Sequence, residues 1–203
     1  MTRLIVIRHG YSSANKNKIY SGHMDVPLEE IGIAQAERTA EYVLKNYKVD
    51  AIYSSDLSRA CNTVRPIADA LGLPLNKCAE LREIDVGKWQ GMLFDDVKTK
   101  MADNYNSYKI DPWNVPIEGG ESYSMVIARA LPKIEEIARD NDGKTVVIAS
   151  HGGAIRALLS VWLDMKDRIW DVPLSGNCSV TVVEYDGGKF EVVSVGYTAH
   201  LDD

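Results

Sequence analysis

Two stretches of this chain, far apart in the sequence, share one pattern: an apolar run that ends in histidine and glycine. The first spans Leu4–Gly10 (LIVIRHG) and the second spans Val146–Gly153 (VVIASHGG). Such a run, bounded by turn signals, predicts a strand that is covered on both faces of a sheet. Because burying a cation is costly, Arg8 and His9 are expected where the first strand leaves the sheet.

A third stretch has a related form. A short strand over about Ala51–Ser54 leads into a helix that carries Arg59 in its first turn, with Ser55 or Asp56 placed to cap that helix. If the three strands are parallel neighbours, two imidazoles and two guanidiniums meet at their carboxyl ends, where open α/β sheets bind ligands. This cluster predicts an anion site formed by Arg8, His9, Arg59 and His151.

In the rest of the chain, segments with helical spacing of apolar residues alternate with extended segments. Helical spacing predicts helices over about residues 28–47, 55–71, 121–141 (with a bend at Pro132) and 154–163, with a weak helix at 94–105. Extended segments are expected at about 75–81 and in a terminal hairpin, 180–185 and 189–195. This alternation predicts a three-layer α/β/α sandwich with a mostly parallel central sheet and a C-terminal β-hairpin.

The chain of 203 residues is expected to form a single domain, residues 1–203, with an excursion at about 92–120. The excursion is polar and rich in Tyr, Asn, Lys and Asp, and about 30 residues do not easily bury a core of their own. Loops set over a rigid sheet often determine substrate choice. We therefore expect residues 92–120 to influence the substrate.

Composition excludes several classes of partner. A net charge of −6 argues against a general nucleic-acid or anionic-membrane surface, and no apolar run reaches the roughly 18 residues of a membrane span. Cys61, Cys78 and Cys178 lack metal-binding spacing and are expected to be buried free thiols in a reducing cytosol. Only Met1–Arg3 precede the first strand, so no signal peptide is expected and a cytoplasmic location is predicted. The oligomeric state is left open.

The residue types at the strand ends suit phosphate chemistry. A neutral imidazole, with an ordinary pKa of about 6.5, can attack phosphorus, and arginine forks match phosphate oxygens. The glycine after each histidine is expected to let a tetrahedral anion approach closely. The helix that begins after Gly152 and Gly153 adds its positive end.

A phosphomonoester also needs an acid to protonate its leaving group. The spacing leaves four carboxylates open: Glu83, Asp85, Asp25 and Glu121. No metal or other cofactor is expected, because His9, His23, His151 and His200 lack metal-binding spacing and nearby arginines repel a cation.

These motifs together resemble the histidine phosphatase superfamily, the phosphoglycerate-mutase-like proteins. Five blocks carry the resemblance in the family's order, within about Leu4–Gly153. They are Arg8–Asn15, like RHGxTxxN with Ser12 for threonine; Ser21–Ala36, with its GxxDxPL pattern; Ser54–Thr63, like SSDLxRAxxT; Leu81–Gly91, with Gln90 for the common glutamate; and Ser150–Gly153.

The resemblance implies a role for each matching residue. His9 would be the nucleophile that forms a phosphohistidine, and Glu83 would be the proton donor that later activates water. Arg8, Arg59 and His151 would hold the phosphoryl oxygens, helped by Asn15 and the backbone around Gly152. Ser21 and Gly22 would lie at the substrate mouth. Fixed cations that stabilise the phosphoryl charge would make a metal unnecessary.

Three functions remain open on this resemblance. A phosphatase admits water to the phosphohistidine, a cofactor-dependent phosphoglycerate mutase excludes it, and a phospholigand-binding regulator turns nothing over. Mutases of the family carry a longer, basic insertion, whereas residues 92–120 offer three lysines and no arginine, offset by five carboxylates. We therefore expect a phosphatase for small phosphomonoesters such as sugar phosphates, phosphoglycerates or α-ribazole phosphate. Tyr105, Tyr108, Trp113 and Tyr123 either line its pocket or pack beneath a loop.

Overall fold

The central sheet of the computed structural model has six strands in the order β3-β2-β4-β1-β5-β6. The structure describes residues 1–174 and 176–202. The first four strands of this order are parallel, and the last two form an antiparallel hairpin beside β1. Their bounds are β1 Thr2–Arg8, β2 Ala51–Ser55, β3 Leu75–Cys78, β4 Thr145–Ser150, β5 Val180–Asp186 and β6 Lys189–Tyr197.

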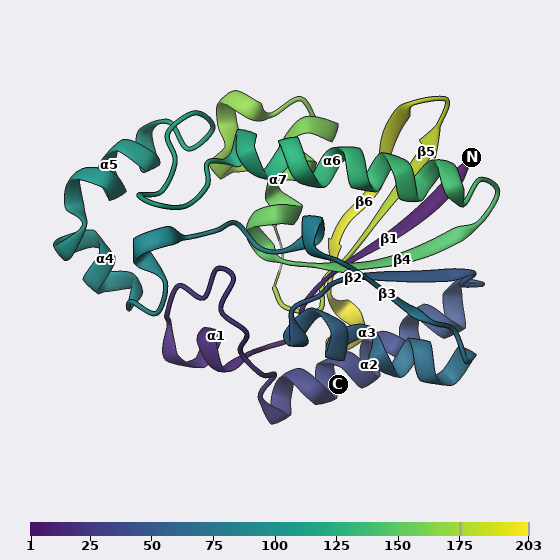
Figure 1. Ribbon diagram of the computed structural model, residues 1–203. Coiled ribbons are helices and arrows are strands. Elements are labelled where there is room, and N and C mark those ends of the chain that lie inside the picture. Colours follow the sequence, from purple (N-terminus) through teal and green to yellow (C-terminus); the bar gives the residue numbers. More distant parts are fainter. Residues whose placement is uncertain (175, 203) are drawn as a thin grey trace.

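Four long helices cover the two faces of this sheet (Figure 1). α2 (Glu30–Asn46) and α3 (Ser58–Leu71) lie on one face, and α6 (Tyr123–Asp140) and α7 (Gly152–Trp162) lie on the other. The three-layer α/β/α sandwich, with its mostly parallel sheet and C-terminal hairpin, is therefore confirmed. The shorter helices are α1 Ser13–Asn17, α4 Phe94–Lys100, α5 Ala102–Ile110, η1 Ala79–Leu81, η2 Gly87–Trp89, η3 Lys166–Asp171 and η4 Ala199–Leu201.

The alternation of side chains along β1 explains why its sequence is apolar throughout. Leu4 and Val6 belong to the core beneath α6 and α7, whereas Ile5 and Ile7 belong to the core beneath α2 and α3. Successive side chains of a strand point to opposite faces, so a strand covered on both sides needs an unbroken apolar run.

The helices differ from expectation in three places. Residues 13–17, where no helix is expected, form α1. The weak helix at 94–105 is instead two helices, α4 and α5, separated at Met101. Neither Ser55 nor Asp56 caps α3; Asp25 Oδ1 accepts from the backbone N–H of Ser58 at 2.8 Å. α6 runs unbroken through Pro132.

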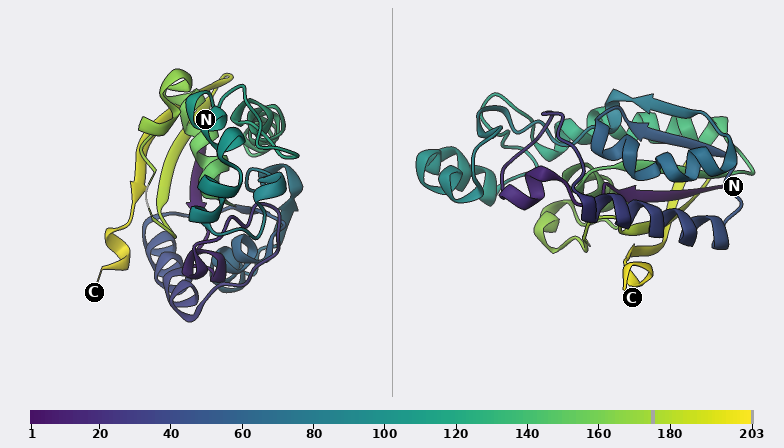
Figure 2. Two further views of the ribbon diagram at one scale, coloured as in Figure 1. Left: turned by 90° about the vertical axis from the view of Figure 1, so that its left-hand side faces the viewer. Right: turned by 90° about the horizontal axis from the view of Figure 1, so that it is seen from below.

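The segment 92–120 lies beyond the end of the sheet at which β1 and β4 finish, next to α1 (Figures 1 and 2). The views agree that α4 and α5 project from this end, while the N-terminus lies at the opposite end. The segment is nevertheless tied to the protein, because Val97, Tyr108 and Ile117 are buried in the core beneath α6 and α7.

Two chain segments cross at the base of this projection, residues 85–88 and 117–121. The N–H of Lys88 donates to the carbonyl of Glu118, and the N–H of Glu121 donates to the carbonyl of Asp85, each at 2.9 Å. A Cβ at Gly87 would lie 2.2 Å from the Glu118 carbonyl oxygen, so only glycine permits this approach. At Gly120, likewise, a Cβ would lie 2.3 Å from the carbonyl oxygen of Asp85. We call the contact between these two segments the 87/120 crossing.

The expected state of the three cysteines is confirmed. Cys61, Cys78 and Cys178 are buried free thiols. Within residues 1–174 and 176–202, none of the helices has the length and apolarity needed to cross a bilayer.

Candidate active site

The three expected strands are parallel neighbours, in the order β2-β4-β1. His9 directly follows β1, His151 directly follows β4, and Arg59 lies in the first turn of α3 after β2. The ring centroids of the two histidines are 5.2 Å apart. The topology therefore brings together the side chains that the strand-end pattern predicts to meet.

His9 is held as a neutral imidazole with a defined tautomer. Its Nδ1 lies 2.8 Å from the carbonyl oxygen of Gly10, which can only accept, so Nδ1 carries the proton and Nε2 keeps its lone pair. Burial, reinforced by the charges of Arg59 and Arg8, lowers the pKa of His9 to about 3. A neutral ring with a free Nε2 is the form required of a nucleophile.

His151 has the opposite tautomer. The Nε–H of Arg59 donates to its Nδ1 at 3.2 Å, and burial together with Arg59 holds the pKa of His151 well below its usual value. Nε2 therefore carries the proton, and within the described residues this buried atom has no hydrogen-bond partner. Such an unsatisfied donor is costly unless an acceptor arrives, as a phosphoryl oxygen would.

Arg59 is fully buried and makes two further hydrogen bonds. Its terminal nitrogens donate to the carbonyl oxygens of Met24 and Gly22, both at 2.8 Å. The same side chain thus orients His151 and holds the loop that carries Ser21 and Gly22. It does not pair with Asp56, which instead binds Arg82 through two hydrogen bonds of 2.5 and 2.7 Å.

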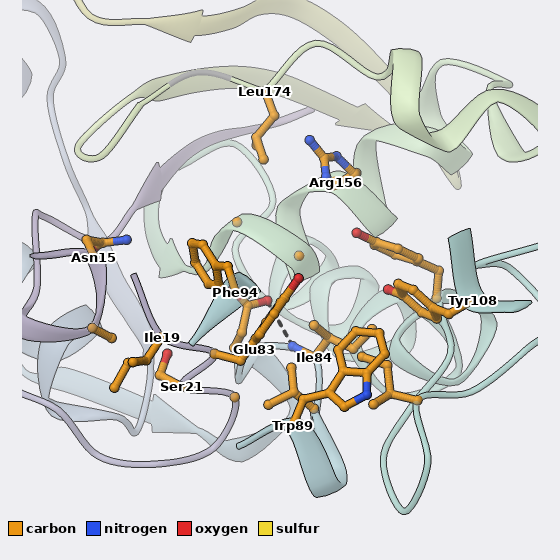
Figure 3. A pocket seen from close by; sticks show the side chains of 18 of the residues that line it. Asn15, Ile19, Ser21, Glu83, Ile84, Trp89, Phe94, Tyr108, Arg156 and Leu174 are labelled. Atoms are coloured by element: carbon orange, nitrogen blue, oxygen red, sulfur yellow. Dashed lines mark hydrogen bonds between the residues drawn. The ribbon is translucent and has the colours of Figure 1, made fainter. Parts of the chain in front are cut away.

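A cavity of about 460 Å³ opens beside these residues (Figure 3). Figure 3 places Asn15 and Ser21 on one side of it and Arg156 and Tyr108 on the other, with Glu83 between them. Among the expected site residues, Arg59 and His151 do not line the cavity, although the His151 ring lies beside that of His9. Those that line it are Arg8, His9, Asn15, Ser21, Gly22, Glu83 and Gly152.

Of the four candidate carboxylates, Glu83 alone lines this cavity. Its Oε1 accepts from the backbone N–H groups of Ile84 and Ala154, at 2.9 and 3.1 Å, so it is anchored at the N-terminus of α7. The other three are used elsewhere: Asp25 caps α3, Asp85 accepts from Gly87, and Glu121 pairs with Arg129.

Ser12 and Asn15 form the capping box of α1, in which Asn15 Oδ1 accepts from both the N–H and the hydroxyl of Ser12. The same Oδ1 also lies 3.2 Å from Nδ2 of Asn177. Because its oxygen is occupied, the Asn15 amide can present only its NH₂ group to the cavity, which suits an anion.

Contacts within the protein also require glycine at positions 10, 152 and 153. A Cβ at Gly10 would lie 2.7 Å from the carbonyl oxygen of Gly32 at the start of α2. At Gly152 it would touch the guanidinium of Arg8 at 3.3 Å, and at Gly153 it would collide with Glu83 Oε1 at 2.4 Å. These glycines make room for the protein's own backbone and site side chains.

Aromatic residues form much of the remaining cavity wall, and the sequence predicts only some of these residues. Of the four aromatic residues expected either to line the pocket or to pack beneath a loop, Tyr105, Tyr108 and Tyr123 line the cavity. Trp113 lies in a separate surface groove. Further aromatic lining comes from Tyr20, Trp89, Phe94 and Trp170.

Two polar residues of the site were missed. Asn177 donates to the carbonyl oxygens of His9 and Gly10 at 2.9 and 3.2 Å, and nothing local in its sequence signals this. Arg156 lines the cavity four residues after Gly152, so helical spacing on α7 could have placed it there.

Among residues 1–174 and 176–202, no group of three His, Cys, Asp or Glu side chains is arranged to hold a metal ion. Nε2 of His23 lies 2.8 Å from the carbonyl oxygen of Glu83. Because a carbonyl oxygen can only accept, His23 Nε2 carries the proton and donates it to this bond. His200 lies against Thr39 of α2, at 3.0 Å. Independence from metal stays a prediction.

Comparisons with known proteins agree with this geometry. Residues 4–198 match the profile of the histidine phosphatase superfamily, branch 1. The chain is 32% identical to phosphoglycerate mutase-like protein 4 of Arabidopsis thaliana, over 98% of this chain and 87% of that one. It is 31% identical to phosphoserine phosphatase 1 of Hydrogenobacter thermophilus, over 100% and 96%.

Among solved structures, YhfR of Bacillus stearothermophilus superimposes with a TM-score of 0.93 at 30% identity, and all of both chains is covered. The sequence motifs, the positions of the two histidines and these likenesses agree. The chain therefore belongs to branch 1 of the histidine phosphatase superfamily, and the predicted enzyme class, histidine phosphatase, is confirmed.

Proposed function

We propose that this enzyme hydrolyses small organic phosphomonoesters through a phosphohistidine on His9, without a metal ion. The observation that carries the proposal is the state of His9. Its Nδ1 is fixed on the Gly10 carbonyl, its pKa is lowered to about 3, and it lines the cavity. Nε2 is thus unprotonated at neutral pH and can act as a nucleophile.

In the first step, His9 Nε2 attacks phosphorus; the P–N bond forms as the ester P–O bond breaks. Glu83 gives its proton to the leaving oxygen, and its position on the cavity wall supports this role. Arg8, the Asn15 amide and His151 Nε2–H are the donors for the phosphoryl oxygens, and Arg59 orients His151. Charge on the phosphoryl group is stabilised by fixed donors, as in other phosphoryl transfers.

In the second step, water attacks phosphorus and the P–N bond breaks. Glu83, now ionised, takes the proton from this water, and inorganic phosphate leaves with His9 restored. Glu83 is suited to both steps because two backbone N–H groups hold Oε1, which leaves the other carboxylate oxygen for proton transfer.

The mutase alternative finds less support. A mutase must hold a second phosphate and exclude water, and the segment 92–120 places one cation on the cavity wall, Lys109, whose exposed side chain lies 3.8 Å from the Trp170 ring. A regulator that only binds a phosphorylated ligand would need neither a neutral His9 as nucleophile nor an anchored Glu83 as proton donor. We further propose that residues 92–120, within a single domain, set substrate choice.

The test is release of inorganic phosphate from a panel of phosphomonoesters, with EDTA present throughout. The His9→Ala variant is the blank, and His200→Gln, a histidine against α2 outside the cavity, is the matched control. We expect release by the wild type and by His200→Gln, and none above background by His9→Ala. Intact mass after brief mixing should show one added phosphoryl group in the wild type and in His200→Gln, and none in His9→Ala. Equal release by His9→Ala would overturn the proposed nucleophile, and loss of activity in EDTA would overturn metal independence.

A further inference from the structure

Arg156 is a cation on the cavity wall for which the proposed hydrolysis has no use. It lies on α7, one turn after Gly152, and its side chain is half-buried beside the cavity (Figure 3). Within residues 1–174 and 176–202 no carboxylate forms an ion pair with it, and its buried Nε has no hydrogen-bond partner. A buried guanidinium nitrogen without a partner is costly unless a ligand supplies an acceptor.

Arg156 lies beside aromatic rings, and the Lys109 ammonium group lies over one of the same rings, that of Trp170. The Cζ of Arg156 lies 5.5 Å from the centroid of the Trp170 ring, and Arg156 interacts with the Tyr123 hydroxyl. Tyr123 stacks on Tyr108, with ring centroids 6.2 Å apart. Burial raises the pKa of both phenols, so both hydroxyl groups stay neutral; the Tyr108 hydroxyl hydrogen-bonds to Tyr123, which keeps its own proton to donate. The end of the cavity at Arg156 therefore offers a cation and two neutral hydroxyls.

This end is separate from the phosphoryl site but close to it. Gly152 packs against the Arg8 guanidinium, and four residues of helix place Arg156 about 6 Å farther along the α7 axis. The charge of Arg156 is near enough to act on Arg8, whose pKa is lowered by burial first and by Arg156 in addition. A ligand with two negative groups a few bonds apart would satisfy both arginines.

We propose that Arg156, with Tyr123 and Tyr108 beside it, binds a carboxylate of the substrate, so that the enzyme prefers phosphomonoesters of short carboxylic acids. This inference rests on the proposed phosphatase function and adds a specificity-determining residue to it. The planar guanidinium fork matches a planar carboxylate, and the Tyr123 hydroxyl can donate to the same oxygens. The aromatic wall leaves the carbon chain between the two anions in an apolar setting.

A matched pair of substrates tests this. 3-Phosphoglycerate and glycerol 3-phosphate share the same three-carbon skeleton and phosphate position, and they differ by a carboxylate in place of a hydroxymethyl group. We expect the wild type to show a higher kcat/KM for 3-phosphoglycerate. In Arg156→Met the ratio of the two kcat/KM values should fall by about 10- to 100-fold, the loss expected for charge-assisted hydrogen bonds.

Two further variants sharpen the result. Arg156→Lys keeps the charge but loses the fork, so its ratio should lie between those of the wild type and Arg156→Met. Arg139→Met removes an exposed arginine of α6, outside the cavity, and should leave the ratio unchanged. If Arg156→Met fails to fold, Arg156→Lys decides the question. A wild type without preference, or a ratio that Arg156 variants do not alter, would overturn the proposal.

Failure of the phosphatase function can be told apart from failure of this inference. If the wild type hydrolyses neither ester, binding of both to His9→Ala is measured by calorimetry, with and without Arg156→Met. Tighter binding of 3-phosphoglycerate that depends on Arg156 would still support the carboxylate site. Equal affinity for the two esters would overturn it.

Discussion

Arg59 donates through Nε–H to Nδ1 of His151 at 3.2 Å, and this bond fixes which nitrogen of His151 carries the proton. The two histidines of the site therefore have opposite tautomers: His9 keeps a lone pair on Nε2, and His151 keeps a proton there. One imidazole is left to attack and the other to donate. A single buried arginine establishes the second of these roles.

The first prediction concerns Arg59. Arg59→Met leaves the carbonyls of Gly22 and Met24 without their donor and frees the tautomer of His151. We expect a loss of about 3 kcal/mol in the free energy of unfolding and at least about a 100-fold loss in kcat. Urea unfolding and phosphate release measure the two effects. Arg65→Met, an exposed arginine on the same helix, should change neither; a similar change there would contradict the assignment.

The second prediction concerns pH and stability. The pKa of His9 is about 3 in the folded protein, because of burial and then Arg59 and Arg8, against about 6.5 when unfolded. A group with a depressed folded pKa contributes stability above its unfolded pKa and loses it as pH falls. Between pH 7 and pH 5, His9 should therefore cost the protein about 2 kcal/mol of unfolding free energy.

Urea unfolding of the wild type and of His9→Gln at both pH values measures this. Groups other than His9 titrate in both proteins and cancel in the comparison. His9→Gln should lose about 2 kcal/mol less than the wild type over this range. An equal loss in the two proteins would show that His9 is protonated in the folded state at pH 5.

The third prediction concerns Glu83 as the proton donor. In Glu83→Gln, kcat/KM for glycerol 3-phosphate should fall by about 10²- to 10³-fold, because an alkoxide leaves poorly without a proton. For 4-nitrophenyl phosphate the loss in kcat/KM should be less than about tenfold, since nitrophenolate leaves unaided. kcat/KM reports the transfer to His9 and is not affected by the later hydrolysis. Equal losses for both esters would point to a different acid.

The fourth prediction concerns the cap of α3. Asp25→Ala removes the acceptor for the Ser58 N–H and should lower the free energy of unfolding by about 1 kcal/mol. Because Arg59 is the next residue along, activity should fall as well. Asp25→Asn keeps a capping oxygen and should behave much like the wild type in urea unfolding and phosphate release. If Asn and Ala are equally damaging, the charge of Asp25 and not its capping bond is what matters.

The sequence was sufficient for the sheet and its carboxyl edge because those depend on local signals. β1 and β4 are apolar runs covered on both faces. A histidine that directly follows such a strand must lie at the carboxyl edge of the sheet. α1 was missed because its capping box uses Asn15 where glutamate or glutamine is usual. Five residues also give too short a window for periodicity to show.

The details that escaped prediction depend on contacts between distant residues. Asp25 caps a helix that begins 33 residues later in the chain, and Gly10 is required by a carbonyl of Gly32. Spacing left four carboxylates open because only the folded chain shows that Glu83 faces the cavity. The positions of Asn177 and Arg156 follow from the same three-dimensional packing.

The 87/120 crossing ties together the two ends of the projecting segment immediately beside Glu83. The chain between residues 88 and 117 therefore begins and ends at the same point on the surface of the domain. Substitutions, insertions and deletions among the intervening residues can therefore reshape the mouth of the cavity while the proton donor keeps its position. If this segment sets substrate choice as proposed, a changed or transferred segment would alter the preferred substrate and leave the residues that perform the chemistry in place.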